Sequence, residues 1–130
     1  MIIEFSLILS LIVFSVAFRL INVYLKKKRE KNKIKFSQYS SPLDQRVHKF
    51  ATYVPNQSLD PKPLIIFLHG AGDVNREFTY MGPLKEIAEY NRKFDFIIAS
   101  IHNDYNGWRP DVVHEFLGLI KRSYKVDNSR

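Results

Sequence analysis

The stretch LIIFLHGAGD, residues 64–73, decides the fold of this chain. Its first five residues are apolar and rich in side chains that prefer β-strands, and the run ends abruptly at His69-Gly70-Ala71-Gly72-Asp73. A short apolar run bounded by a glycine turn is typical of a strand buried on both faces, as in a parallel sheet. The sequence therefore predicts a central parallel strand over Leu64–Leu68.

The glycine turn after this strand is a candidate functional site. In an open parallel sheet, ligands bind beyond the carboxyl ends of the strands. Gly70 and Gly72 allow backbone conformations that other residues avoid, and they leave backbone N–H groups uncovered. Such amides can stabilise negative charge developing on an ester or amide oxygen, typically by about 2.7–4 kcal/mol per donor. An ordinary tight connection between strand and loop is the alternative.

A phosphate cradle is a further alternative for the same turn. The spacing of the glycines matches neither G-x-G-x-x-G nor G-x-x-x-x-G-K-[ST]. In addition, the carboxylate of Asp73 would repel an anion. The turn is therefore a poor match to a phosphate-binding loop.

The flanking residues alternate between strand and helix patterns. Residues Arg46–Pro55 suit a strand or the end of a hairpin, and Phe94–His102 is a second strand of the buried type. Between them Pro83 opens a helical pattern, and Pro110 begins a second helix, as proline suits the first helical position. The predicted order from residue 46 is β-β-α-β-α, which indicates an α/β fold with a parallel sheet.

The amino-terminal region differs in charge from the rest. Residues 1–35 hold eight basic and two acidic side chains, whereas residues 36–130 hold 12 basic and 11 acidic side chains. The high isoelectric point is therefore a property of the amino-terminal region, and a nucleic-acid partner is not predicted. The chain has no cysteine and no H-x-x-x-H or H-E-x-x-H pattern, so no metal site is predicted.

An apolar run of 21 residues extends from Phe5 to Leu25 if Arg19 and Asn22 are tolerated near one end. At about 1.5 Å per residue, a helix of this length would cross a hydrocarbon core of roughly 30 Å. The lysine and arginine residues that follow favour the cytoplasmic side. We therefore predict a single-pass transmembrane anchor with the rest of the chain in the cytosol. A cleaved signal peptide and a buried helix are the alternatives.

These patterns divide the chain into three parts. Residues 1–25 are predicted to be the anchor, which has the lipid bilayer as its partner. Residues 26–45 form a basic flank and a linker, and residues 46–130 form the α/β domain. The basic flank could bind anionic headgroups at about 1 kcal/mol per residue, or it could simply be solvated.

Four segments of the α/β part carry a family resemblance. They are YVP at 53–55, KPLIIFLHGAGD at 62–73, PLKEIAEYNRKFDFIIASI at 83–101 and WRPDVVHEFLGLIKRSYKVDNSR at 108–130. Together they resemble the amino-terminal part of an α/β-hydrolase, in the branch that contains polyhydroxybutyrate depolymerases, feruloyl esterases and related predicted peptidases. The resemblance implies a serine esterase acting on small carboxylic esters, without a metal or organic cofactor.

The resemblance also implies roles for single residues. His69 matches a histidine that is structural in this family and is not the catalytic base. Trp108 and Asp73 would border a substrate cleft, with packing of the loop base and a solvated loop as alternatives. The oxyanion hole would include backbone amides of Gly70, Ala71 and Gly72.

The chain departs from the family at its catalytic centre. In the family, a following strand leads to the G-x-S-x-G elbow that carries the nucleophile, and none of the ten serines here fits that pattern. Chance pairings, such as Ser123 with His114 or Ser100 with His102, lack the required geometry or an oxyanion donor. We therefore expect a partial, membrane-anchored serine hydrolase whose catalytic triad is missing.

Two other functions stay open. One is a peptidase or thioesterase of the same fold, because a fold does not decide chemistry. The other is a non-catalytic, membrane-anchored interaction protein. Without the elbow strand, Leu64–Leu68 becomes an exposed apolar edge, and such an edge favours self-association.

Overall fold

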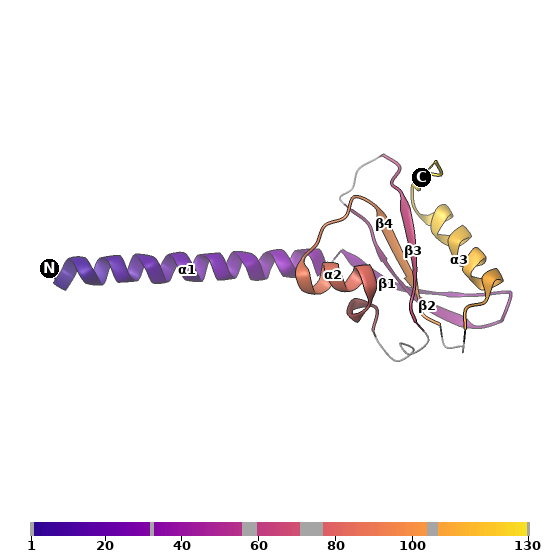
Figure 1. Cartoon of the computed structure of the whole chain (residues 1–130), viewed down its shortest axis with the longest axis horizontal. Coiled ribbons are helices and arrows are strands. Elements are labelled where there is room, and N and C mark those ends of the chain that lie inside the picture. The colour runs from indigo at the N-terminus through magenta and orange to yellow at the C-terminus, as the bar shows by residue number, and fades with distance from the viewer. Residues whose placement is uncertain (1, 32, 56–59, 71–76, 104–106, 130) are drawn as a thin grey trace.

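A computed structural model describes the chain (Figure 1) except for residues 1, 32, 56–59, 71–76, 104–106 and 130. The sheet has strands β1 (Ile34–Ser40), β2 (Val47–Tyr53), β3 (Leu64–Leu68) and β4 (Ile97–Ile101), in the order β1-β2-β4-β3. Strands β3 and β4 are parallel, and β2 runs antiparallel to both of its neighbours, β1 and β4. The helices are α1 (Ile2–Lys31) before β1, the 3-10 helix η1 (Phe78–Tyr80) and α2 (Gly82–Tyr90) between β3 and β4, and α3 (Pro110–Ser123) after β4.

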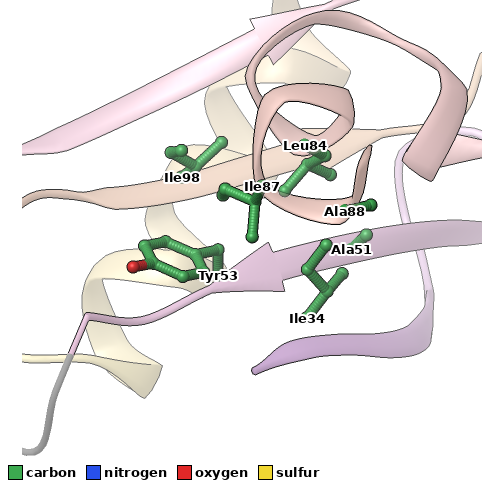
Figure 2. Close-up of a cluster of buried hydrophobic side chains, with 7 residues drawn as sticks. All are labelled: Ile34, Ala51, Tyr53, Leu84, Ile87, Ala88 and Ile98. Carbon is green, nitrogen blue, oxygen red and sulfur yellow. The ribbon is translucent and has the colours of Figure 1, made fainter. Parts of the chain in front are cut away.

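Helix α2 covers one face of the sheet. Its residues at positions i, i+3 and i+4, the predicted buried face, are at most 6% exposed, which confirms that prediction. They pack on side chains from β1, β2 and β4 (Figure 2). The cluster consists of Ile34, Ala51, Tyr53, Leu84, Ile87, Ala88 and Ile98.

Helix α3 packs against a second cluster. Because successive side chains of a strand point to opposite faces, Phe50 of β2 and Ala99 of β4 join α3 while their neighbours join α2. Helix α3 contributes Val112, Phe116 and Ile120 to this second cluster. Strand β4 is buried along its whole length, as the continuous apolar pattern predicted.

Strand β1 lies within the stretch for which the sequence favoured a linker. It forms a hairpin with β2, in which Ile34 lies opposite Tyr53 and Ser40 opposite Val47. Only Ile34 of this strand is fully buried, at 5% exposure. This edge strand is therefore defined by its backbone pairing with β2 and not by buried side chains, so a hydrophobic pattern cannot predict it.

The predicted transmembrane helix is corrected by the structure. Helix α1 exists and extends away from the sheet (Figure 1). In the part of the chain that the structure describes, however, no helix is long and apolar enough to cross a membrane.

Candidate functional site

The parallel pairing of β3 and β4 brings two loop starts together. Leu68 and Ile101 are register partners, so His69 and His102 leave the sheet side by side. Their ring centroids are 5.5 Å apart. This is the carboxyl edge of the parallel pair, where open α/β sheets bind their ligands.

His69 is buried at 3% exposure, and both of its ring nitrogens have partners. The backbone N–H of Asn103 donates to Nε2 at 3.0 Å, so Nε2 must carry a lone pair. Nδ1 lies 2.9 Å from the carbonyl oxygen of Gly70, and the neutral tautomer with the proton on Nδ1 donates to it. With both nitrogens engaged, His69 has a structural position and holds no lone pair ready for a substrate proton.

The loop that joins β4 to α3 also contacts His69. The indole N–H of Trp108 donates to the carbonyl oxygen of His69 at 3.0 Å, and the two rings meet edge to face at 5.1 Å. The side-chain amide of Asn103 donates to the carbonyl oxygen of Gly107 at 2.8 Å. Thus His69, Asn103 and Trp108 tie the end of β3 to the loop that joins β4 to α3.

This arrangement fixes the backbone at the start of the glycine turn. The Asn103 bond holds the ring of His69, and that ring in turn holds the Gly70 carbonyl. Both bonds hold residues at the start of the turn, and the amides further along it lie outside the described residues. Chemically, His69, Asn103 and Trp108 supply a scaffold.

The predicted site residues are only partly described. Gly70 is exposed at the carboxyl edge of β3. Ala71, Gly72 and Asp73 lie outside the described residues, so their oxyanion and substrate roles stay predictions. Trp108 is half-buried, and the cavity it lines has a volume of only about 10 Å³. Its place in a substrate cleft also stays a prediction.

The structure describes both serines that the sequence analysis weighed as chance nucleophiles, Ser100 and Ser123. Ser100 is 1% exposed in the middle of β4, where substrate cannot reach its hydroxyl. The hydroxyl of Ser123 donates to the carbonyl oxygen of Leu119 within α3. Within the same described ranges, no group of three or more His, Cys, Asp and Glu side chains could hold a metal ion.

Sequence reasoning overlooked Asn103. This residue follows β4 by two positions and is 5% exposed, although asparagine is usually exposed. The available signal was its place after a buried strand, opposite the His69 turn. A polar residue at the carboxyl end of a parallel strand is expected to point at the neighbouring loop.

A separate polar cluster joins the β1–β2 turn to α3. Nε2 of His48 lies 2.9 Å from the carboxylate of Asp44, and both side chains are nearly inaccessible to solvent. The hydroxyl of Ser41 donates to the carboxylate of Glu115. Burial, and then the carboxylates of Glu115 and Asp44, raise the pKa of the Tyr39 hydroxyl far above its ordinary value. These groups brace the hairpin.

At the start of α3, the hydrogen bond from exposed Arg109 lowers the pKa of the Asp111 carboxyl. The carboxylate of Asp111 also accepts the backbone N–H of Val112, in the first turn of the helix. The carboxylate of Asp111 is favourable in this first turn because the positive end of the helix dipole lies at the amino terminus of α3.

No protein family and no curated protein matches the sequence. In structure, the chain is similar to a thermostable esterase, with a TM-score of 0.51 and 14% identity over 74% of this chain and 32% of that one. It is also similar to the S-formylglutathione hydrolase FrmB of Staphylococcus aureus, with a TM-score of 0.57 and 12% identity over 75% of this chain and 43% of that one.

A ferulic acid esterase superposes with a TM-score of 0.49 and 17% identity, over 72% of this chain and 45% of that one. The chain therefore spans less than half the length of the proteins it resembles. The first two similarities establish an α/β-hydrolase-like fold. At such low identity they establish the fold alone.

Proposed function

We propose that this chain is the oxyanion-stabilising part of a serine hydrolase that cleaves carboxylic esters. The observation that carries the proposal is the fixed His69–Gly70 turn at the carboxyl end of β3. Backbone amides of Gly70, Ala71 and Gly72 bind the oxyanion of the tetrahedral intermediate. A serine nucleophile, its histidine base and an orienting acid come from chain outside residues 1–130.

In this proposal each group has a separate task. The serine attacks the ester carbonyl, and the histidine takes the serine proton and passes it to the leaving alcohol. The carbonyl oxygen gains negative charge during the attack, and the amides of the glycine turn stabilise it. His69 does not exchange a proton, because its two nitrogens hold Asn103 and Gly70 in place.

Labelling with a serine-directed fluorophosphonate tests the proposal. The transcript is first read through and beyond codon 130, and its complete product is labelled beside residues 1–130. We expect a labelled serine within G-x-S-x-G in the complete product and none in residues 1–130. A specifically labelled serine within residues 1–130, or a stop codon directly after Arg130, would contradict the proposal.

Substitution at Ala71 then tests the oxyanion role in the complete product. Ala71→Pro removes the backbone N–H, and we expect kcat for a p-nitrophenyl ester to fall about 10²–10³-fold. Ala71→Ser keeps the N–H and serves as the matched control. An equal loss of kcat in both variants would remove the amide from the mechanism.

A non-catalytic interaction protein is the second candidate, and the outer edge of β3 favours it. Along Leu64–Leu68 the described residues pair β3 with β4 only. Ile65 and Leu68 are 40% and 36% exposed on this strand. An apolar open edge pairs readily with a strand of another chain. In this function the chain self-associates through β3. Ile65→Lys should then lower the dimer fraction measured by sedimentation. Val47→Lys is the control, because exposed Val47 lies on β2, away from the edge of β3, and it should leave the dimer fraction unchanged.

We also propose that α1 attaches the protein to the surface of a lipid membrane. From Leu11 to Leu25 its large apolar side chains are between 51% and 71% exposed, and exposed Lys26 and Lys28 follow. Anionic lipids of the cytosolic leaflet attract such lysines, which favours a cytosolic location. Flotation with vesicles is expected for the parent and not for Phe14→Glu with Phe18→Glu. Equal flotation of both would exclude α1 as the membrane-binding element.

A further inference from the structure

The apolar helix α1 carries one narrow polar stripe. Its members Ser15, Arg19, Asn22 and Lys26 follow one another at spacings of four, three and four residues, and all four are exposed. At about 100° per residue, they fall within about 60° of the helix circumference. A helix that lies along a membrane surface can turn such a stripe to the water while its remaining apolar side chains enter the lipid. The stripe therefore favours an orientation of α1 in the plane of the membrane.

Helix α1 is joined closely to the α/β domain. It ends at Lys31, and β1 begins at Ile34. Its carboxyl-terminal part also lies against α2 (Figure 1). A short connection and a packing contact leave no long flexible tether between the two parts. A helix α1 that lies in the plane of the membrane therefore holds the domain at that surface.

Helix α2 leads from α1 to the candidate site. Its first residue, Gly82, lies against the ring of Phe67, two residues before His69. Helix α2 has nine residues, and at 1.5 Å per residue it is about 13 Å long. Along α2, the contact with α1 is therefore within about 13 Å of the residue that lies beside the His69 turn.

An exposed aromatic side chain lies at the site end of α2. Tyr80, in η1, is 57% exposed and precedes Gly82 by two residues. Its backbone N–H donates to the carbonyl oxygen of Glu77 at 3.0 Å, within this short helical turn. Tyrosine has an apolar body and a polar tip, which suits a position between lipid and water. An apolar acyl chain can pack against the ring of Tyr80 on its way to the His69 turn.

We propose that the ester substrate is a lipid held in the membrane and has a long apolar acyl chain. This inference rests on the proposed function and names the substrate class of the same site. The in-plane helix α1 holds the site near the lipid, and Tyr80 contacts the acyl chain. Attack by the serine breaks the acyl C–O bond, and the lipid alcohol leaves with the proton that the histidine base carries. Water then cleaves the acyl-serine and releases a free fatty acid.

Fluorescence of Trp108 tests the geometry without any catalysis. It is the single tryptophan of the chain, and its indole N–H donates to the carbonyl oxygen of His69. Residues 1–130 are mixed with vesicles of phosphatidylcholine and phosphatidylglycerol, with and without a nitroxide on the lipid headgroup. We expect the nitroxide to lower the emission of Trp108 in the parent and not in Phe14→Glu with Phe18→Glu.

Two outcomes of this measurement would overturn the inference. A parent that floats with the vesicles but keeps its full emission has its candidate site away from the membrane. A parent that does not float has no membrane from which to take a substrate. Both results leave the esterase proposal itself standing, because neither concerns turnover of a soluble ester.

Turnover by the complete product tests the substrate class. The substrates are p-nitrophenyl butyrate in solution and p-nitrophenyl palmitate dissolved in the same vesicles. We expect Phe14→Glu with Phe18→Glu to lower kcat/KM for the palmitate at least about tenfold, because membrane binding concentrates the enzyme beside its substrate. The kcat/KM for the butyrate should not change. Equal kcat/KM of parent and variant on the palmitate would refute the inference alone, whereas turnover of neither ester by the parent would refute the proposed function and the inference together.

A last pair of variants tests the contact with the acyl chain. Tyr80→Ser removes the aromatic ring at the site end of α2, and Tyr90→Ser removes one at the opposite end. Tyr80 and Tyr90 are similarly exposed, at 57% and 61%, and circular dichroism checks that both variants fold. We expect KM for p-nitrophenyl octanoate to rise about threefold or more in Tyr80→Ser and to stay constant in Tyr90→Ser, because apolar contact is lost only near the site. Equal KM values of the two variants would contradict the role of Tyr80.

Discussion

The two ends of the parallel strands β3 and β4 are built from opposite chemistry. At the carboxyl end, buried neutral groups satisfy one another, with His69 at the centre. At the amino end, lysines surround an open pocket, and the Asp95 carboxylate that pairs with Lys62 is 85% exposed. Buried hydrogen bonds are costly to lose, whereas exposed charge pairs contribute little to stability. We therefore expect substitutions at the carboxyl end to lower the free energy of unfolding more than those at the amino end.

Replacement of His69 should have the largest effect on stability. His69→Phe leaves the buried N–H of Asn103 without its acceptor and the Gly70 carbonyl without its donor. The exposed Gly70 can bind water instead, whereas an unsatisfied buried N–H costs about 1–3 kcal/mol, so we expect the free energy of unfolding to fall by about 1–3 kcal/mol. Denaturation with urea measures this change. His114→Phe, on an exposed residue of α3, is the control, and equal stability of both variants would show that the histidine network does not stabilise this end.

Gly82, the first residue of α2, lies against Phe67 near the carboxyl end of β3. Its φ is +48°, and a Cβ there would lie 2.4 Å from the ring of Phe67. Gly82→Ala therefore combines an unfavourable backbone conformation with overpacking, and we expect it to lower stability by about 1–3 kcal/mol.

The matched control for this substitution is Gly118→Ala in α3. There the nearest atom is the movable end of Arg122, at 3.3 Å, and alanine favours a helix over glycine. Thermal melts of the two variants should shift in opposite directions. A melting temperature of Gly82→Ala at or above that of the parent would show that β3 can move away from α2.

Trp108 offers a smaller test of the carboxyl end. Trp108→Phe keeps an aromatic ring beside His69 but removes the N–H that donates to the His69 carbonyl. A typical hydrogen bond contributes about 0.5–1.5 kcal/mol, and we expect a loss in that range by urea denaturation. Combined with His69→Phe, the loss should be less than additive, since both act on one network. Full additivity would mean that the two residues brace the loops independently.

The sequence predicted those parts of the fold that are buried on a regular period. The continuous run of β4 and the i, i+3, i+4 face of α2 belong to this class. It missed β1, because only Ile34 of that strand is buried and pairing of backbone groups leaves no side-chain pattern. It also missed Asn103, since a contact between two loop ends depends on the register of β3 and β4. The pocket lined by Lys33, Lys62 and Lys93 was not predicted for the same reason, because the three lysines are far apart along the chain.

The amino end should give the smallest change in stability. Lys62→Gln removes the ion pair with Asp95, and because that carboxylate is largely exposed, we expect a loss of at most about 0.5–1 kcal/mol. The backbone hydrogen bonds of Lys62 to Lys125 and Asp127 do not involve its side chain, so the strand start should be unchanged. Urea denaturation at low and high salt measures the effect, which should vanish as salt screens the pair. A salt-independent loss above about 2 kcal/mol would mean that the lysines hold the fold together, and the contrast between the two ends would fail.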